Sequence, residues 1–235
     1  MQLFYNPEIS ETTKEFTLQA EESKHLIKVL RKKEGDEFHI TNGKGWLFVA
    51  SLVTTDPKNA TAKVISATNK HSKMHSLHMV VAPTKSNDRF EWFLEKATEI
   101  GVNEITPIIC SRSERKILKL DRLQKVIQGA MKQSLRTHLP LLHPPITFTE
   151  YMKKKHPGIL FIAHCHEDEK VELKRRIAPD KPITILIGPE GDFTEAEVDQ
   201  AYEQGFIAVS LGESRLRTET AAIYACTTVA IYNSR

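Results

Sequence analysis

The spacing of hydrophobic positions changes character at about residue 70. Before it, short β-like apolar runs are separated by turn signals such as Asn42-Gly43 and Asp56-Pro57. A helical segment at about Glu21–Arg31 interrupts these runs, which lie at Leu3–Tyr5, Glu37–Ile40, Trp46–Val53 and Thr61–Ala67. The pattern predicts a small β-barrel domain with one helix over residues 1–70, an architecture that often binds nucleic acid.

From residue 71 to 235 the pattern predicts a second domain, in which strands alternate with helices. The expected strands are Leu77–Ala82, Glu104–Cys110, Gly158–His164, Ile183–Ile187 and Phe206–Leu211. The expected helices are Asp88–Ile100, Asp121–Thr137, Glu150–Lys155, Glu195–Gln204 and Glu219–Tyr232. Such alternation is typical of an α/β fold with a mainly parallel sheet and helices on both faces.

A linker is expected between the two domains, at residues 71–78. Its histidines, His71, His75 and His78, have a spacing that would suit a metal ion on a helix. No carboxylate or cysteine accompanies them, and the following run is strand-like. A boundary segment with incidental histidines is therefore the favoured interpretation, and no metal is expected.

The stretch from Ile183 to Glu197 carries the clearest local signal. An apolar run is followed by the turn Gly188-Pro189-Glu190-Gly191 and then by Thr194 and Glu197, which have the spacing of a capping box. The order is strand, glycine turn and helix start. In an open α/β sheet, such a turn at the carboxyl end of a strand is where ligands bind. A plain tight connection is the alternative that this stretch alone leaves open.

Composition narrows the class of protein. The chain has 235 residues, of which 40% are hydrophobic and 27% charged, which is typical of a soluble globular protein. No apolar run approaches the roughly 20 residues of a membrane helix, and the first residues lack a signal-peptide pattern. Three widely separated cysteines favour a reduced, cytoplasmic location. Phosphate-loop, dinucleotide-binding and hydrolase-elbow motifs are missing from the sequence.

The net charge of +3 is unevenly distributed. Residues 71–140 contain 12 Lys and Arg against 7 Asp and Glu, which favours a surface that faces a polyanion. Within the helix expected from Asp121, a basic stripe consists of Arg122, Lys125, Lys132 and Arg136. The N-terminal helix ends in a second basic group, His25, Lys28, Arg31, Lys32 and Lys33. Each group has an ordinary solvent-facing surface as its alternative interpretation.

Four segments together resemble one family. They are residues 95–102 (EKATEIGV), 132–136 (KQSLR) with Pro140, 187–191 (IGPEG), and 211–212 with 216–221 (LG and LRTETA). In this order and spacing the chain resembles the 16S ribosomal RNA uracil-N3 methyltransferases of the SPOUT superfamily. His25-Leu26, Val29-Leu30-Arg31 and Gly35-Asp36 also match the small N-terminal domain of that family.

The resemblance implies a PUA-like barrel followed by an α/β domain with a deep trefoil knot, in a cytoplasmic homodimer. It implies S-adenosylmethionine as the cofactor and N3 of a specific uridine near the decoding site, in the assembled small ribosomal subunit, as the target. The implied cofactor-binding residues are His164, Leu186, Ile187, Gly188, Pro189, Gly191, Leu211, Gly212, Leu216 and Arg217. The implied RNA-binding residues are Arg31, Lys33, Lys85, Arg89, Arg112, Arg115, Lys132 and Arg136.

Catalysis would require the uracil N3 to lose its proton, because the neutral nitrogen is a poor nucleophile. Arg217 is the candidate for stabilising negative charge on a uracil oxygen, and Glu190 or Glu219 for accepting the proton. Both glutamates have structural alternatives. Glu190 would bind loop amides, and Glu219 would sit favourably at a helix N-terminus. The structural alternative is favoured for Glu219 and left open for Glu190.

The chain departs from the family pattern at two places. Asp192 stands where the family usually has glycine, and Ser214 and Arg215 stand where it usually has a basic and then an aliphatic residue. These departures affect the expected loop shape and the expected RNA contacts. The rival functions are a non-catalytic RNA-binding assembly factor that keeps the fold, and a SPOUT methyltransferase that acts on another RNA or on the ribose 2′-OH.

Overall fold

The computed structural model describes residues 2–70, 76–167, 169–178 and 181–233. These residues fall into two compact units. The first contains the N-terminal part up to residue 70 together with residues 128–139. The second contains residues 76–127 and the chain from Pro140 onward. Most of the predicted linker, residues 71–75, lies outside the described residues.

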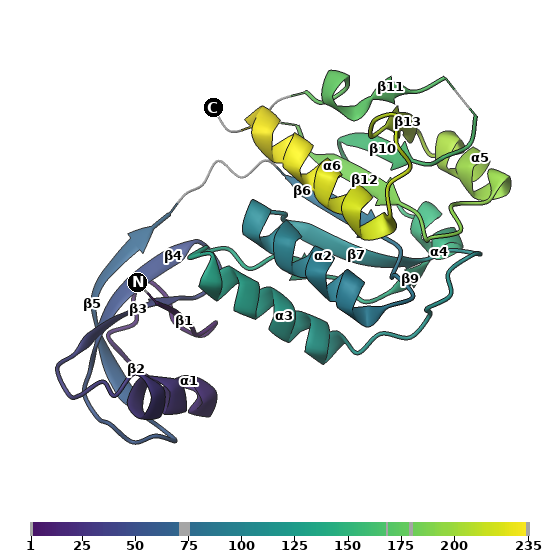
Figure 1. The fold of residues 1–235 in the computed structure, drawn as a ribbon. Coiled ribbons are helices and arrows are strands. Elements are labelled where there is room, and N and C mark those ends of the chain that lie inside the picture. Colours follow the sequence, from purple (N-terminus) through teal and green to yellow (C-terminus); the bar gives the residue numbers. More distant parts are fainter. Residues whose placement is uncertain (1, 71–75, 168, 179–180, 234–235) are drawn as a thin grey trace. The chain divides into compact units, whose positions relative to one another are not determined.

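The first unit is built on a five-stranded sheet in the order β1-β3-β4-β5-β2 (Figure 1). Strand β1 pairs parallel with β3, and the other neighbours are antiparallel. Alternate residues such as Phe4, Phe38, Ile40 and Phe48 point into one buried cluster. The strands are β1 (Leu3–Tyr5), β2 (Glu15–Thr17), β3 (Glu37–Thr41), β4 (Trp46–Leu52) and β5 (Thr61–Asn69).

Two details of the first unit differ from the expectation. The predicted helix is α1 (Ala20–Lys24) continued by a π-helical turn, η1 (His25–Val29). It ends before Arg31, which adopts a left-handed φ of 56°. Strand β2 was not expected, because its three residues are only partly buried or exposed and carry no clear apolar alternation.

The second unit is built on an eight-stranded sheet in the order β11-β13-β10-β12-β6-β7-β8, with β9 pairing β7. All its strand pairs are parallel, which confirms the predicted sheet type. The strands are β6 (Leu77–Val81), β7 (Glu104–Ile109), β8 (Leu141–Leu142), β9 (Ile146–Thr147), β10 (Ile159–Ala163), β11 (Val171–Glu172), β12 (Ile183–Ile187) and β13 (Ile207–Ser210). The two-residue strands were too short to predict from periodicity.

Helices cover both faces of this sheet, as the alternation predicted. On one face α4 (Phe148–Met152) and α5 (Glu195–Glu203) pack in a buried cluster with Val80, Ile162 and Leu186. Helices α2 (Asn87–Ile100) and α6 (Thr218–Asn233) lie side by side (Figure 1), and α6 contacts β6 and β12. A short 3-10 turn, η2 (Leu173–Arg175), follows β11.

Helix α3 (Leu120–Gln133) differs from its prediction at both ends. It begins at Leu120, so Asp121 lies in the first turn and does not cap the helix. It stops at Gln133 because Leu135 adopts a left-handed φ of 59° and the Arg136 amide bonds the Met131 carbonyl. Arg136 therefore lies beyond the helix, and the predicted basic stripe does not continue to it.

Two helix boundaries of the second unit follow the sequence signals. Thr194 and Glu197 form the predicted capping box, with each side chain bonding the backbone amide of the other residue. Gly101 ends α2 with a φ of 111°, in the left-handed region that glycine accepts.

Across the described residues, no helix combines the length and apolar character that crossing a membrane requires.

Candidate active site

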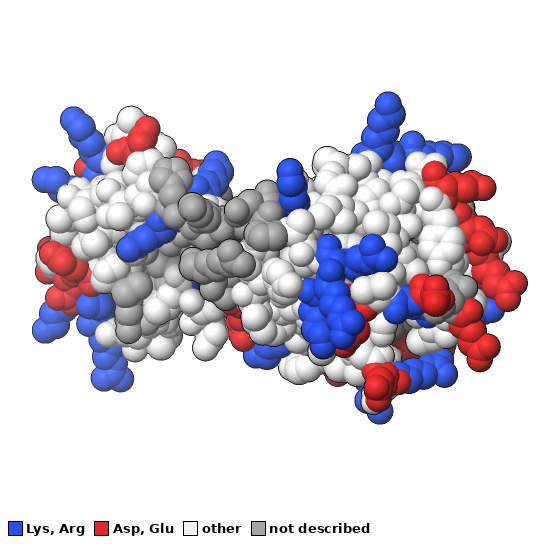
Figure 2. Space-filling model, turned by 90° about the horizontal axis from the view of Figure 1, so that it is seen from above, with Lys and Arg blue, Asp and Glu red and all other residues white. Residues whose placement is uncertain are grey.

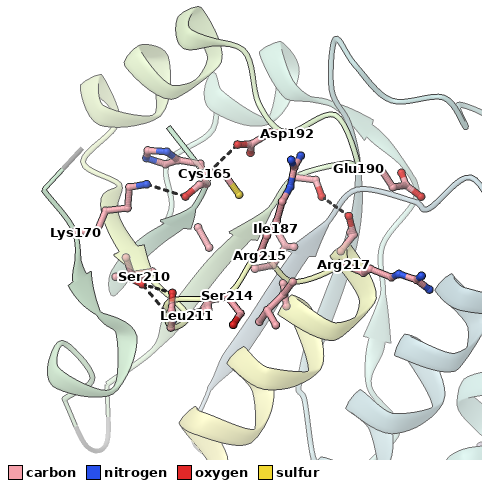
Figure 3. Close-up of a pocket in the computed structure, with 18 of the residues that line it drawn as sticks. Cys165, Lys170, Ile187, Glu190, Asp192, Ser210, Leu211, Ser214, Arg215 and Arg217 are labelled. Atoms are coloured by element: carbon pink, nitrogen blue, oxygen red, sulfur yellow. Dashed lines mark hydrogen bonds between the residues drawn. The ribbon is translucent and has the colours of Figure 1, made fainter. Parts of the chain in front are cut away.

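A cavity of about 630 Å³ lies at the carboxyl ends of three neighbouring strands, β10, β12 and β13. Its walls come from residues 163–165, from the turn after β12, and from residues 209–218, with Lys170 and Ala221 completing them (Figure 3). The central position of β10 between β13 and β12 brings these separate segments together. The cavity therefore occupies the edge where ligands bind in open α/β sheets.

Eight of the ten residues expected to bind a cofactor line this cavity: His164, Ile187, Gly188, Pro189, Leu211, Gly212, Leu216 and Arg217. The other two do not. The Leu186 side chain packs in the buried cluster under α4 and α5, because it points to the opposite face from Ile187. Gly191 lies against Arg112, whose Cβ would be 3.2 Å from an added Cβ. That the eight residues bind a cofactor stays a prediction.

Hydrogen bonds hold the two glycine-containing loops in place. The Thr218 hydroxyl donates to the Gly188 carbonyl at 3.1 Å and thus joins the turn after β12 to the start of α6. The Ser210 hydroxyl bonds both the amide and the carbonyl of Gly212, at 3.1 and 3.0 Å. Gly212 has a φ of +118°, which side-chain-bearing residues rarely adopt, so this position requires glycine.

Asp192, where the resembled family usually has glycine, has a definite structural role. Its φ is 62°, in the left-handed region that aspartate tolerates better than most residues. One carboxylate oxygen accepts from the Cys165 amide at 2.7 Å, and the other from the Phe193 amide at 2.9 Å. Asp192 therefore keeps the backbone shape of a glycine turn and also ties that turn to the end of β10.

Lys170 belongs to the cavity although the sequence analysis did not single it out. Its ammonium group donates to the carbonyl of His164 at 2.9 Å and also to that of His166. The His166 ring in turn donates to the Phe193 carbonyl at 2.8 Å. These bonds fix the chain after β10, and no sequence motif marks them, because each joins a side chain to backbone.

The two glutamates considered for proton transfer both have structural partners. Glu190 accepts a hydrogen bond from the Lys85 amide at 2.9 Å, which supports its loop-binding alternative. Glu219 lies buried in the first turn of α6, with one oxygen 3.7 Å from Arg89 Nε. Its other oxygen has no hydrogen-bond partner within the described part of the chain. Glu219 does not line the cavity.

Arg217 lines the cavity from the loop before α6. In Figure 3 its side chain extends away from the Lys170 and Cys165 side. Ser214 and Arg215, the residues that depart from the family pattern, line the cavity from the same loop. Ser214 and Arg215 are thus both cavity residues. The predicted catalytic role of Arg217 is consistent with this place but stays a prediction.

The eight predicted RNA-binding residues divide equally between the two units. Arg31, Lys33, Lys132 and Arg136 belong to the first unit, and Lys85, Arg89, Arg112 and Arg115 to the second. On the face shown in Figure 2, basic side chains gather in one group on the larger unit, and acidic side chains gather at the end of that unit. That the eight predicted residues bind RNA stays a prediction.

Several of these cations already have intramolecular partners. Lys132 pairs with the buried Glu22 at 2.7 Å within the first unit. Burial lowers the pKa of Arg136. In the second unit, Lys85 pairs with the Glu114 carboxylate at 2.9 Å. Arg112 donates to the Gly191 carbonyl at 2.9 Å, and Arg115 donates to the Lys85 carbonyl at 2.6 Å. An RNA would therefore compete with these contacts or bind the nitrogens that they leave open.

The three cysteines are free thiols in different surroundings. Burial raises the pKa of the Cys110 and Cys226 thiols. Cys165 is exposed and lines the cavity. The neighbouring His164 ring bonds the Tyr202 hydroxyl at 3.1 Å and contributes to the wall of the same cavity.

Comparisons with known proteins agree with this architecture. A family model described as the RNA methyltransferase domain matches residues 70–230, and one described as the RNA methyltransferase PUA domain matches residues 18–65. Ribosomal RNA small subunit methyltransferase E of Rickettsia conorii is 30% identical over 236 residues, which cover 99% of this chain and 96% of the relative.

Two solved structures are similar over nearly the full length. A probable rRNA-methyltransferase from Porphyromonas gingivalis has 36% identity and a TM-score of 0.90, with coverage of 99% of this chain and 100% of that one. Ribosomal RNA small subunit methyltransferase E from Neisseria gonorrhoeae, bound to S-adenosyl methionine, has 30% identity and a TM-score of 0.86, with coverage of 99% and 98%. Family model, relatives and fold agree, and the chain belongs to the RNA methyltransferase family in which this domain follows a PUA domain.

Proposed function

We propose that this protein uses S-adenosylmethionine to methylate N3 of a specific uridine near the decoding site of 16S ribosomal RNA, in the assembled small subunit. The observation that carries the proposal is the cavity at the ends of β10, β12 and β13, built from the loops that the family resemblance implies. The similarity to a small subunit methyltransferase E with S-adenosyl methionine bound supports both the cofactor and the class of substrate.

The residues of the cavity suit this cofactor. Its volume of about 630 Å³ is in the range of small-molecule sites. The turn after β12 and the loop before α6 both line the cavity, and their backbone groups are the candidates for reading the adenine ring. Three acidic residues (Glu190, Asp192, Glu213) and three basic ones (Lys170, Arg215, Arg217) line the cavity, which suits a ligand that carries both positive groups and a carboxylate. A phosphate-binding lysine loop is unnecessary, because this ligand has no phosphates.

The cofactor, when bound, supplies a methyl group already activated by its sulfonium, so that the protein must prepare the nitrogen acceptor. The N–CH₃ bond would form as the S–CH₃ bond breaks and leaves a neutral thioether, and the N3 proton would pass to a base. Arg217 is the candidate for stabilising the negative charge that develops on a uracil oxygen. Because N3 lies on the Watson–Crick edge, the target uridine must be unpaired or extruded when it reacts.

The role of Glu190 is testable because its two interpretations respond differently to one substitution. Glu190→Gln keeps an oxygen that accepts from the Lys85 amide but removes the base. A loop-binding role predicts nearly normal turnover at saturating cofactor and RNA. A proton-accepting role predicts a loss of about 10²–10⁴-fold. Arg217→Ala measured in the same assay should lose turnover, and full activity of that variant would disprove its proposed role.

The experiment that tests the function uses small subunits from a strain that lacks the gene. These subunits are incubated with the purified protein and S-adenosylmethionine, and the RNA is read by reverse transcription. A methyl group on the Watson–Crick edge stops the polymerase at the modified uridine. A single new stop on assembled subunits supports the proposal, whereas incorporation elsewhere, or into ribose, would refute the assignment to N3.

RNA binding would draw on the basic residues of both units. Charge removal at Arg31 and Lys33 should lower affinity for the subunit and reduce the dependence of binding on salt, by a slope of about one for each phosphate that is no longer neutralised. An unchanged slope would exclude these residues from the RNA surface. Calorimetry with S-adenosylmethionine separates the enzyme from a non-catalytic assembly factor, because such a factor would not need to bind it.

The proposal includes a cytoplasmic homodimer and a trefoil knot in the second unit. Large apolar side chains are exposed on the adjacent helices α2 and α6, including Trp92 (46%), Tyr224 (42%) and Ile231 (67%). A self-complementary contact between two copies would cover such a face. Light scattering of the wild-type protein should give twice the mass of one chain. Tyr224→Glu should shift the measured mass towards that of a single chain.

A further inference from the structure

A second cluster of potential metal ligands lies at the opposite edge of the large sheet from the cavity. His78 is near the start of β6, Glu104 begins β7, and His143 directly follows β8. One ligand atom from each lies within 4.8 Å of the others, and all three residues are half-buried. The strands are parallel, so the amino ends of β6 and β7 are one strand length from the carboxyl-end edge that holds the cavity.

We propose that His78, Glu104 and His143 form a binding site for a divalent transition metal, with Zn²⁺ as the best-fitting ion. Two imidazoles and one carboxylate are a ligand set that zinc accepts, at distances of about 2.0–2.2 Å, with a fourth position left for water. The three ligands come from different segments of the second unit. A bound ion would therefore join β6, β7 and the chain after β8.

The surroundings of His78 match those of a metal-binding histidine. One ring nitrogen, Nε2, lies 2.7 Å from the hydroxyl of the buried Thr106. A ligating histidine commonly gives one ring N–H to such a neighbouring oxygen, which orients the ring and leaves the other nitrogen free to bind the ion.

Glu104 and His143 already lie together, with Oε2 and Nε2 2.8 Å apart. An ion bound to both atoms would take the place of the proton between them and move them to about 3.3 Å apart, the spacing of neighbouring ligands in a tetrahedral zinc site. For this pair the required movement is about half an ångström. The side chains are 40% and 34% exposed, so they have room to adjust and an ion has a route of entry.

Tyr151 gives an independent indication that a polar group is missing at this place. Its ring packs edge-on against His78, with centroids 6.3 Å apart, and its hydroxyl is buried without a hydrogen-bond partner in the described regions. A water on the open metal position would offer the hydroxyl a partner.

The test uses the full-length protein, treated with chelator and then titrated with ZnCl₂ by calorimetry. We expect one ion per chain and a zinc-dependent rise in Tm. Glu104→Gln and His143→Gln should each weaken zinc affinity at least tenfold. His39→Gln, which changes another half-buried strand histidine in the first unit, is the matched control and should bind zinc normally. Equal affinity in all four proteins would overturn the proposal.

Two further measurements keep the result decisive if a variant folds poorly. X-ray absorption of the wild-type zinc complex should show two imidazoles with the remaining ligands oxygen, and a sulfur ligand or a single imidazole would refute the site. The double variant His71→Gln, His75→Gln should keep its affinity. If it loses zinc, the metal is held by the histidines whose sequence spacing suggested a site, and the proposed cluster is wrong.

Discussion

Replacement of Asp192 would test whether this residue shapes the cavity. The carboxylate accepts from the amides of Cys165 and Phe193, and the backbone φ is 62°. Three substitutions separate these contributions. Asp192→Gly removes both bonds but relaxes the backbone. Asp192→Ala removes both bonds and adds backbone strain. Asp192→Asn tolerates the left-handed conformation and keeps one accepting oxygen.

The expected losses of unfolding free energy depend on how far the two amides that bond Asp192 are buried. The Phe193 residue is fully buried, so leaving its amide without an acceptor costs about 1–3 kcal/mol. Cys165 is exposed, so water would replace most of the second bond. We therefore expect Asp192→Gly to lose about 1–3 kcal/mol of unfolding free energy. A left-handed alanine costs about 1–2 kcal/mol more, partly offset by about 0.4–1 kcal/mol from its stiffer unfolded chain. Asp192→Asn should lose only about 1–2 kcal/mol.

Urea unfolding gives the stability of each variant, and calorimetry with S-adenosylmethionine gives its cofactor affinity. The expected order of stability is wild type, Asn, Gly and then Ala. Cofactor affinity should fall in the variants that release the turn from the end of β10. If Asp192→Ala matched the wild type in both measurements, or proved more stable than Asp192→Gly, the structural role derived from the geometry would be wrong.

Three further changes probe the surrounding structure. Thr194→Ala should cost about 1 kcal/mol of unfolding free energy through loss of the α5 cap that it forms with Glu197, whereas Thr194→Ser should be nearly neutral in urea unfolding. Gly212→Ala should strain the loop by about 1–3 kcal/mol and weaken cofactor binding, whereas Gly205→Ala, equally open and also at positive φ but outside the cavity, should reduce stability alone. Cys165 should react first with a thiol reagent, and S-adenosylmethionine should slow that reaction, whereas the two buried thiols should react only on unfolding, as mass spectrometry would show.

Local signals predicted most of the second unit well. The strand Ile183–Ile187 has the predicted bounds, and its five buried residues explain why a continuous apolar run indicated a central strand. The capping box at Thr194 and the glycine stop at Gly101 were equally clear. Each of these features is decided by residues within a few positions of one another. The end of α3 was not, because no sequence rule gives Leu135 a left-handed conformation.

The cavity depends on contacts that local patterns do not contain. Asp192 bonds the amide of Cys165 across 27 residues, and Thr218 bonds the carbonyl of Gly188 across 30. Periodicity predicts that β10, β12 and β13 exist, but it does not say that β10 lies between the other two. The loops were identified through the family resemblance. The side chains that tie them together, Asp192 and Lys170, required the structure.

The sequence pattern and the structure together explain why Asp192 can stand where the family usually has glycine. A glycine turn needs a positive φ, and aspartate is one of the few side-chain-bearing residues that adopt it at low cost. Once the left-handed conformation is accepted, the carboxylate lies where two backbone amides can donate to it. A residue that breaks the family pattern thus preserves the backbone of the pattern and adds a tie to β10. Ser214 and Arg215 line the same cavity, and no hydrogen bond or ion pair within the described residues explains them.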